Sequence, residues 1–270
     1  MTVAFSKANA KLEALYDVPE LEPFLRLERV DGKFQVRKVY SFDLISGWSC
    51  PQAKDCLSKV VEIGGKRSIK DGKDCQFRCF SASQEATFPS AYDKRKRNFD
   101  GLKNLKSSYD MAHAIADAMP HNLGICRIHV AGDFFNQLYF RAWHLVAEWH
   151  PDRLFYAYTK SLNYWLADRN DLPNNLVLTA SRGGRLDHLI DQYNFRESKV
   201  VFSEAEADAL GYEIDHTDEH AAIPAIRNES FALLIHGVQP KGSKASAAIK
   251  ALKQNGTKFA YGKKSAKVGA

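Results

Sequence analysis

The sequence predicts an α/β fold in which a parallel sheet of about six strands forms a partial (β/α) barrel. Three observations predict it. Strand-like and helix-like segments alternate along most of the chain, and an irregular cysteine-rich segment follows the first strand. The 270 residues are 45% hydrophobic, enough for the core of one large domain or two small ones. Alternating strands and helices imply parallel strands joined by right-handed crossovers. An open doubly wound sheet has the same alternation and is the alternative to the barrel.

The first predicted strand leads directly into the cysteine-rich segment. Residues Val36 to Phe42 alternate and are rich in strand formers, and Ser46-Gly47 ends the strand just before Cys50. From Cys50 to about Asp100 the chain is polar and punctuated by glycine. We therefore expect an irregular segment there, organised by a bound ion or cluster.

The rest of the chain alternates between helical and strand periodicity. Apolar residues recur at helical spacing from Leu105 until Pro120 ends the pattern, and a strand follows at 125–130. Asn136 can cap the next helix, which ends before Pro151. The other predicted strands are 154–158, 176–180, 199–203 and 230–238, and the other predicted helices are 162–167, 186–193, 204–210 and 243–255.

Charge divides the chain into two parts. Segment 241–270 contains eight lysines and no acid, so residues 1–240 carry a net charge of −2 although the whole chain carries +6. We predict one iron–sulfur (β/α) domain over 1–240 and a Lys-rich C-terminal helix and tail over 241–270. Such a tail keeps a protein soluble or makes weak, sequence-independent contact with nucleic acid.

No membrane partner is expected, and the predicted location is a bacterial cytoplasm. The longest apolar stretch, Phe231 to Ile235, is far shorter than the roughly 20 residues that span a bilayer. The N-terminus lacks the apolar block of a secretory signal.

Four of the five cysteines are grouped: Cys50, Cys56, Cys75 and Cys79. In a reducing cytoplasm such a group indicates metal or redox chemistry rather than disulfides. The C-x5-C spacing is wider than the pairs that usually hold zinc, whereas iron–sulfur clusters accept looser spacing. We predict one [4Fe–4S] cluster held by these four thiolates, with a zinc site or unligated thiols as the alternatives.

Polar residues at the ends of the predicted strands mark the mouth of the barrel, where sites of parallel α/β folds gather. They are Asp133, Thr159, Lys160, Ser181, Arg182, Ser203, Glu204 and His236. The two-residue period of the strand at 125–130 places Arg127 and His129 on the inward face, and Cys126 with Ile128 and Val130 on the buried face. We predict that Arg127, His129, Asp133 and Lys160 surround the cofactor, and that Cys126 is a core residue.

An ordered set of motifs resembles a family of phage proteins of unassigned function, named after a mycobacteriophage gene product. The motifs are Ser46-Gly47, Cys50-Pro51-x-Ala53-x-x-Cys56, Phe77-Arg78-Cys79, the run from Arg127 to Phe134, the segment from Phe155 to Ser161, and Ala180-Ser181-Arg182. The resemblance covers about residues 40 to 205. It implies a virus-encoded protein made in a bacterial cytoplasm, with a host or phage partner that remains to be identified.

A more distant similarity is to radical S-adenosylmethionine enzymes, in which a cysteine loop after a strand holds a [4Fe–4S] cluster at the mouth of a partial barrel. It implies S-adenosylmethionine as a further cofactor. The sequence departs from that pattern because it lacks C-x3-C-x2-C. If all four cysteines bind, no iron is left for the methionine moiety. Three functions therefore stay open: a redox or radical enzyme, a non-catalytic cluster protein, or a zinc-stabilised module that contacts nucleic acid.

Overall fold

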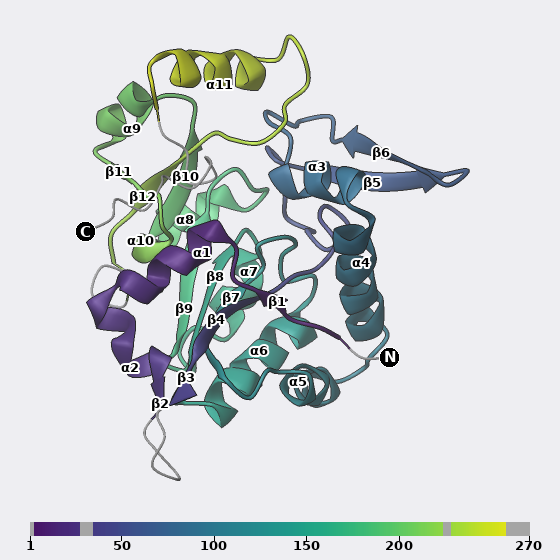
Figure 1. The fold of residues 1–270 in the computed structure, drawn as a ribbon, viewed down its shortest axis with the longest axis vertical. Helices are drawn as coiled ribbons and strands as arrows, with labels where there is room; N and C mark the ends of the chain where they lie inside the picture. Colours follow the sequence, from purple (N-terminus) through teal and green to yellow (C-terminus); the bar gives the residue numbers. More distant parts are fainter. Residues whose placement is uncertain (1–2, 28–34, 224–227, 258–270) are drawn as a thin grey trace, which may run out of the picture.

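The computed structural model describes residues 3–27, 35–223 and 228–257. At its centre lies one eight-stranded sheet in the order β1-β4-β7-β8-β9-β10-β12-β11 (Figure 1). Its strands are β1 (Ser6–Lys7), β4 (Lys38–Phe42), β7 (Leu123–Ile128), β8 (Leu154–Thr159), β9 (Leu176–Ser181), β10 (Glu197–Val201), β11 (Glu213–Ile214) and β12 (Phe231–Leu234).

The sheet is parallel except at one edge, where the short β1 pairs antiparallel with β4. The six strands from β4 to β12 follow one another in chain order, without the reversal that defines a doubly wound sheet. The prediction of a parallel α/β fold is confirmed. The finer prediction, that this sheet curls into a partial barrel, stays a prediction.

Helices cover both faces of the sheet. One face packs against α5 (Ser108–Asp117), α6 (Gln137–Trp149), α7 (Leu162–Ala167) and α8 (Asp187–Tyr193). The other face packs against α1 (Ala10–Glu13), two 3₁₀ helices (Ala14–Asp17 and Pro19–Leu21), α2 (Glu22–Leu25) and α10 (Glu219–Ala222). Near β12, α9 (Glu204–Leu210) and α11 (Lys244–Gln254) bury a third apolar cluster.

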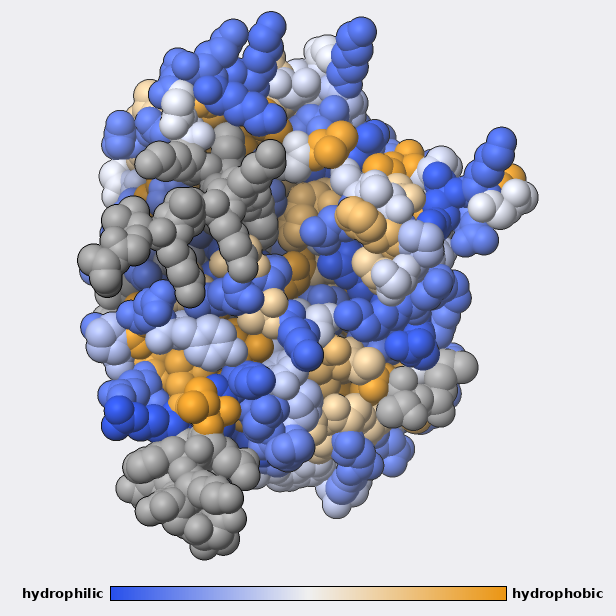
Figure 2. All heavy atoms as spheres, viewed as in Figure 1, coloured by the Kyte–Doolittle hydropathy of each residue, from blue (hydrophilic) through white to orange (hydrophobic). Residues whose placement is uncertain are grey.

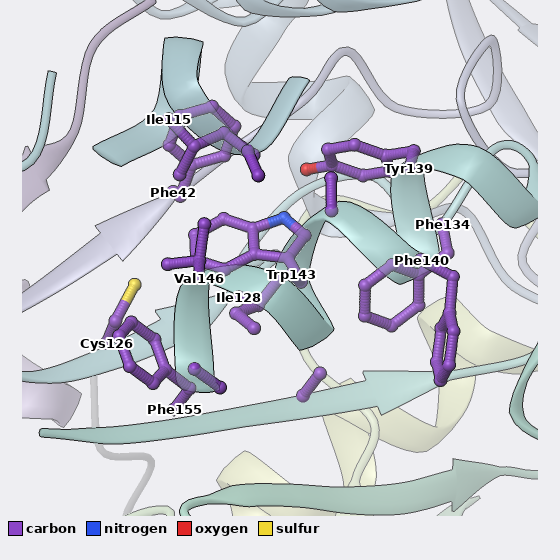
Figure 3. Packing of buried hydrophobic residues seen from close by; sticks show 14 of the residues in the cluster. Phe42, Ile115, Cys126, Ile128, Phe134, Tyr139, Phe140, Trp143, Val146 and Phe155 are labelled. Atoms are coloured by element: carbon purple, nitrogen blue, oxygen red, sulfur yellow. The ribbon is translucent and has the colours of Figure 1, made fainter. Parts of the chain in front are cut away.

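The largest core cluster lies between the sheet and α6. Trp143 of α6 is fully buried, with its ring centroid 5.3 Å from that of Phe42 and 5.9 Å from that of Phe155 (Figure 3). Ile128 and Cys126 of β7 belong to the same cluster. The prediction that Cys126 is a core residue is therefore confirmed.

Replacing Cys126 tests this placement. Cys126→Ala should lower the free energy of unfolding by about 1 kcal/mol, the cost of a small cavity in a packed core. Urea denaturation at neutral pH measures the change. An unchanged free energy of unfolding would contradict the placement.

The segment between Cys50 and Asp100 is more regular than predicted. It contains an antiparallel hairpin of β5 (Ser58–Ile63) and β6 (Lys66–Asp71), followed by α3 (Phe80–Thr87) and α4 (Pro89–Lys103). Gly64 and Gly65 both have positive φ, the conformation that a two-residue hairpin turn requires. The four grouped cysteines lie in the irregular stretches 43–57 and 72–79. The expectation that the whole segment is irregular was wrong, because the Gly64-Gly65 turn and the helix that begins at Pro89 make the rest of it regular. A second small hairpin joins β2 (Arg26–Leu27) to β3 (Gln35–Val36).

Strand β7 ends earlier than predicted, which changes where two side chains point. His129 has φ of 69°, in the left-handed region, so strand alternation stops at Ile128. Arg127 lies on the face of the sheet that α1, α2 and α10 cover, where it bonds to Asp218. His129 turns instead toward Tyr139 of α6, and Val130 packs in the apolar cluster beneath α1, α2 and α10. The predicted shared faces of Arg127 with His129, and of Cys126 with Val130, are therefore wrong.

Other element predictions hold closely. Helices α7 and α9 have the predicted bounds, and the side chain of Asn136 caps α6 by accepting from the amide of Tyr139 at 2.8 Å. Helix α11 confirms the helix predicted at 243–255, whereas residues 258–270 of the predicted tail lie outside the described residues. No helix in the described part of the chain is long and apolar enough to cross a membrane.

Candidate functional site at the carboxyl ends of the strands

A cavity of about 230 Å³ lies at the carboxyl ends of the parallel strands. Its walls come from the loops after β4, β7, β8 and β9, from β12 and the residues that follow it, and from the start of α3. In the space-filling view, apolar surface is visible between α11 and the β5–β6 hairpin (Figure 2). Because it lies at the carboxyl ends of parallel strands, the cavity is where α/β folds of this kind bind their ligands.

Three thiols line this cavity: Cys50, Cys56 and Cys79. Burial raises the pKa of all three thiols, and it raises that of Cys79 to about 11. Cys79 sits at the N-terminus of α3, where the amides of Ser81 and Ala82 act against that effect. Buried thiols of this kind are protonated at neutral pH unless a cation or metal replaces the proton.

Cys75, the fourth thiol of the predicted set, does not line the cavity. It follows the β5–β6 hairpin, and its Sγ lies 3.1 Å from the carbonyl oxygen of Phe77 and 3.7 Å from Oγ of Ser58. It remains close to Cys56 and Cys79, whose charges interact with its own. The structure thus brings the four cysteines into one neighbourhood and separates one of them from the cavity.

Asp133 is a buried carboxylate in the cavity wall. Its Oδ1 accepts from Thr159 Oγ1 at 2.6 Å and from the amide of Phe134 at 2.7 Å, while Oδ2 accepts from the amide of Lys160 at 2.9 Å. Burial raises the pKa of Asp133 to about 6 despite these donors. The carboxylate joins the loops after β7 and β8 beside the thiols of Cys50 and Cys56.

Lys160 also lines the cavity, and its ammonium joins two loops. Nζ donates to Ser181 O, Ser181 Oγ and Arg182 O, each at 2.8 Å. The next residue, Gly183, accepts through its carbonyl from the amides of Lys54 and Asp55 in the cysteine loop. Lys160 therefore supports the backbone that holds the Cys50–Cys56 loop over the end of β9.

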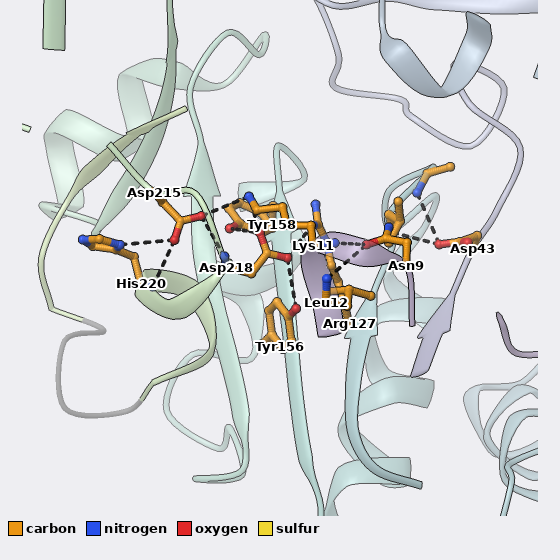
Figure 4. Close-up of polar contacts among 12 residues, drawn as sticks. Asn9, Lys11, Leu12, Asp43, Arg127, Tyr156, Tyr158, Asp215, Asp218 and His220 are labelled. Atoms are coloured by element: carbon orange, nitrogen blue, oxygen red, sulfur yellow. Dashed lines mark hydrogen bonds and ion pairs between the residues drawn. The ribbon is translucent and has the colours of Figure 1, made fainter. Parts of the chain in front are cut away.

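A buried network of charges forms another part of the cavity wall (Figure 4). Asp218 forms ion pairs with Lys11 at 2.6 Å and with Arg127, and it accepts from the hydroxyls of Tyr156 at 3.0 Å and Tyr158 at 3.1 Å. Burial acts to raise the pKa of Asp218, but Arg127 and Lys11 outweigh it and hold the pKa below its usual range. The carboxylate is therefore ionised at neutral pH, with two cations compensating it.

Asp215 extends this network. It pairs with Lys11 at 3.1 Å and with Nδ1 of His220 at 3.2 Å, and its carboxylate accepts from the amide of Asp218 at 3.0 Å. The hydrogen bond to Asp215 raises the pKa of His220. The wall is thus built from paired charges contributed by the N-terminal segment, β7 and the β11–α10 turn.

The four residues that the sequence predicts around the cofactor all line the cavity: Arg127, His129, Asp133 and Lys160. His129 is oriented by Tyr139 of α6, whose hydroxyl lies 2.9 Å from Nε2. Burial, aided by Arg127, lowers the pKa of His129 to about 3, so the imidazole is neutral at pH 7. Binding of a cofactor by these residues stays a prediction.

The other strand-end residues divide into two groups. Ser181 and His236 line the cavity, and Thr159 supports it through Asp133. Arg182, Ser203 and Glu204 do not line it. Arg182 pairs with Asp191 and Glu197, Ser203 caps α9, and Glu204 accepts from the hydroxyl of Thr257.

Sequence reasoning missed Lys11, Tyr158, Asp215, His216 and Asp218, which also line the cavity. The run Asp215-His216-Thr217-Asp218 offered a signal, since two acids flank a histidine in a turn. Lys11 offered none, because only the tertiary fold brings α1 beneath the strand ends.

No group of three or more His, Cys, Asp and Glu side chains in the described ranges is arranged to hold a single metal ion. One zinc ion places every ligand sulfur at about 2.3 Å from the same point. A [4Fe–4S] cluster instead distributes its thiolates over several iron atoms. The arrangement therefore gives no support to either metal, and both the cluster and the zinc alternative stay predictions.

Comparison with known proteins agrees with the resemblance of the motifs. No curated protein and no solved structure matches the chain. A family model described as Gene product 88 matches residues 3–255, a longer span than the motifs cover. The chain therefore belongs to the Gene product 88 family.

Proposed function

We propose that this chain binds a [4Fe–4S] cluster through its grouped cysteines and acts in redox or radical chemistry. The observation that carries the proposal is that Cys50, Cys56 and Cys79 line one cavity at the carboxyl ends of parallel strands. Soft thiolates are the ligands that iron–sulfur clusters require. A cavity of about 230 Å³ bordered by them offers room that a single ion does not need.

The cavity walls fit a cluster electrostatically as well as by donor type. A cluster with thiolate ligands is anionic, and cationic or hydrogen-bonding groups nearby stabilise its reduced form. Lys160 supplies a positive charge that hydrogen bonds hold in place, and Lys11 and Arg127 supply donors whose charge Asp218 compensates. When bound, the cluster would supply one-electron transfer; these side chains would tune its potential and exclude water.

Two features support a role like that of radical S-adenosylmethionine enzymes. The six parallel strands follow chain order, as in a singly wound barrel, and the cysteine loop follows the first of them. Addition of S-adenosylmethionine to the reduced protein separates this role from simple electron transfer. A changed electron paramagnetic resonance spectrum favours the radical role, and an unchanged spectrum favours electron transfer or a structural cluster.

Anaerobic purification followed by iron, sulfide and zinc analysis tests the proposal itself. We expect brown protein with iron and acid-labile sulfide, and loss of both when Cys50, Cys56, Cys75 and Cys79 are all replaced by Ser. Cys126→Ala is the matched control, since it removes the remaining cysteine from the core and should keep the full cluster content. Retention of iron and sulfide by the quadruple variant, or zinc in their place, would contradict the proposal.

A further inference from the structure

The β5–β6 hairpin projects from the body of the molecule and sorts its side chains onto two faces (Figure 1). Side chains alternate along each strand, so the register decides which residues share a face. The outer face carries three cross-strand pairs: Lys59 with Lys70, Val61 with Ser68, and Ile63 with Lys66. The inner face carries the other three: Ser58 with Asp71, Val60 with Ile69, and Glu62 with Arg67. The acids of the hairpin therefore lie on one face and its lysines on the other.

The inner face packs against the body of the molecule. Val60 and Ile69 belong to an apolar cluster with Tyr92 of α4. The acids of this face also have cations nearby, since Asp71 forms an ion pair with Arg78 at 2.6 Å and Glu62 lies directly opposite its cross-strand partner. The outer face is therefore the one that a partner can reach.

The outer face is basic and carries no acid. Lys66 and Lys70 are exposed, and within the described ranges no ion pair joins the lysines of this face to a carboxylate. The exposed lysines of α4 differ, since they pair with Asp100. Lys59 and Lys70 stand directly opposite each other, with Cβ atoms about 5 Å apart, and like charges in that position destabilise a hairpin. An anionic partner would remove this cost.

Trp48, from the loop after β4, adds an aromatic ring beside these lysines. Its Nε1 donates to the carbonyl of Val60 at 2.9 Å, and Nζ of Lys59 lies 4.1 Å from the ring centroid. The side chain is nevertheless 49% exposed. Proteins that bind single-stranded nucleic acid combine these two features, because the cations contact the phosphates while the ring stacks on a base.

A second basic element, α11, meets the hairpin segment at the cavity. Phe80, which follows the hairpin, and His236, which precedes α11, both line the cavity, with ring centroids 5.0 Å apart. Helix α11 has no acid and exposes three lysines: Lys244, Lys250 and Lys253. Figure 2 shows hydrophilic side chains projecting from both elements around the apolar surface between them. A flexible strand can follow such an uneven surface, whereas a flat bilayer meets only its outermost points.

We propose that the outer face of the β5–β6 hairpin binds single-stranded nucleic acid, with Lys59, Lys66 and Lys70 on the phosphates and Trp48 stacked on a base. The surface belongs to the hairpin and is distinct from the Lys-rich segment 241–270. The inference concerns binding alone, so it does not rest on the proposed function or on a bound cluster.

Fluorescence anisotropy with a labelled thymidine oligonucleotide tests the lysines. Replacing Lys59, Lys66 and Lys70 together by Gln should weaken binding by the full chain about tenfold or more. Each phosphate contact on a single strand contributes about 0.7 to the slope of log K against log salt, so this variant should reduce the slope by about 2. Because the variant removes a like-charged pair, its thermal unfolding midpoint should be no lower than that of the wild type.

A second triple variant is the matched control. Lys38, Lys103 and Lys106 are also exposed, at the start of β4 and around the end of α4, and replacing them by Gln removes the same net charge. Charges beyond a Debye length from the strand are screened, so affinity should change about twofold or less.

Two variants of Trp48 test the stacking contact. Trp48→Leu should weaken binding about tenfold and leave the salt slope unchanged, because stacking on a base is not a phosphate contact. Trp48→Tyr loses the same hydrogen bond to Val60 but keeps an aromatic ring, so it should retain most of the affinity. Circular dichroism checks that each variant is folded.

Equal losses of affinity from the two triple variants would overturn the inference, because net charge alone would then explain binding. So would tighter binding of polyglutamate or of phosphatidylserine vesicles than of the oligonucleotide, since the partner would then be an acidic protein or a membrane. Absence of oligonucleotide binding at low salt would have the same meaning. Iron analysis of the same preparations tests the proposed function separately, so either proposal can fail without the other.

Discussion

Asp218→Asn should lower the free energy of unfolding by about 3–5 kcal/mol, because it leaves Lys11 and Arg127 buried without full compensation. The substitution preserves the shape of the side chain. Asp218 has φ of 64°, a left-handed conformation that asparagine tolerates as well as aspartate, so no backbone strain is added. Urea denaturation at pH 7 measures the loss.

Asp100→Asn is the matched control for this prediction. Asp100 also pairs with two cations, Lys96 and Lys103, but those lysines are half exposed to solvent. Exposed pairs contribute about 1 kcal/mol or less, so this variant should change little. Equal losses from the two variants would show that burial of the network around Asp218 does not matter.

The same network predicts how stability depends on pH. The folded pKa values of Asp218 and Asp215 lie below the value of about 3.9 for an unfolded aspartate. Their contribution is therefore fully present above that value and is lost as the pH falls below it through the folded pKa values. Asp218→Asn should weaken the acid dependence of the unfolding free energy, and a wild-type slope in the variant would contradict this.

Lys160→Met should lower the free energy of unfolding by about 3 kcal/mol and loosen the Cys50–Cys56 loop. Lys160 is only 8% exposed, and methionine replaces its stem but leaves three oxygens of Ser181 and Arg182 without their donor. A buried acceptor that loses its partner costs about 1–3 kcal/mol. Limited proteolysis should then cut the cysteine loop faster.

Lys54→Met provides the comparison, because Lys54 lies on the same loop with an exposed side chain. It should leave both stability and proteolysis unchanged. If Lys160→Met behaves like Lys54→Met, the ammonium does not position the cysteine loop, and its place beside the thiols has another reason.

Local patterns in the sequence determined the architecture. The periodicity of short segments predicted α6, α7, α8 and α9 and the parallel pairing of the strands between them, because side-chain spacing reflects which face is buried. The same reasoning placed Cys126 in the core and put Asp133 and Lys160 at strand ends. Strand direction alone predicts that Asp133 and Lys160 lie near each other, since the carboxyl ends of parallel strands share one edge of the sheet.

Only the tertiary structure decided how the site is assembled. A single left-handed residue, His129, turned its own ring toward α6, and strand alternation cannot anticipate such a reversal. The carboxylate of Asp218 met Lys11 and Arg127 from segments far apart in the chain. Hydrogen bonds around the β5–β6 hairpin separated Cys75 from the other three thiols, although spacing alone makes all four equivalent. Contacts between distant segments set these positions, and a linear pattern of residue types carries no record of them.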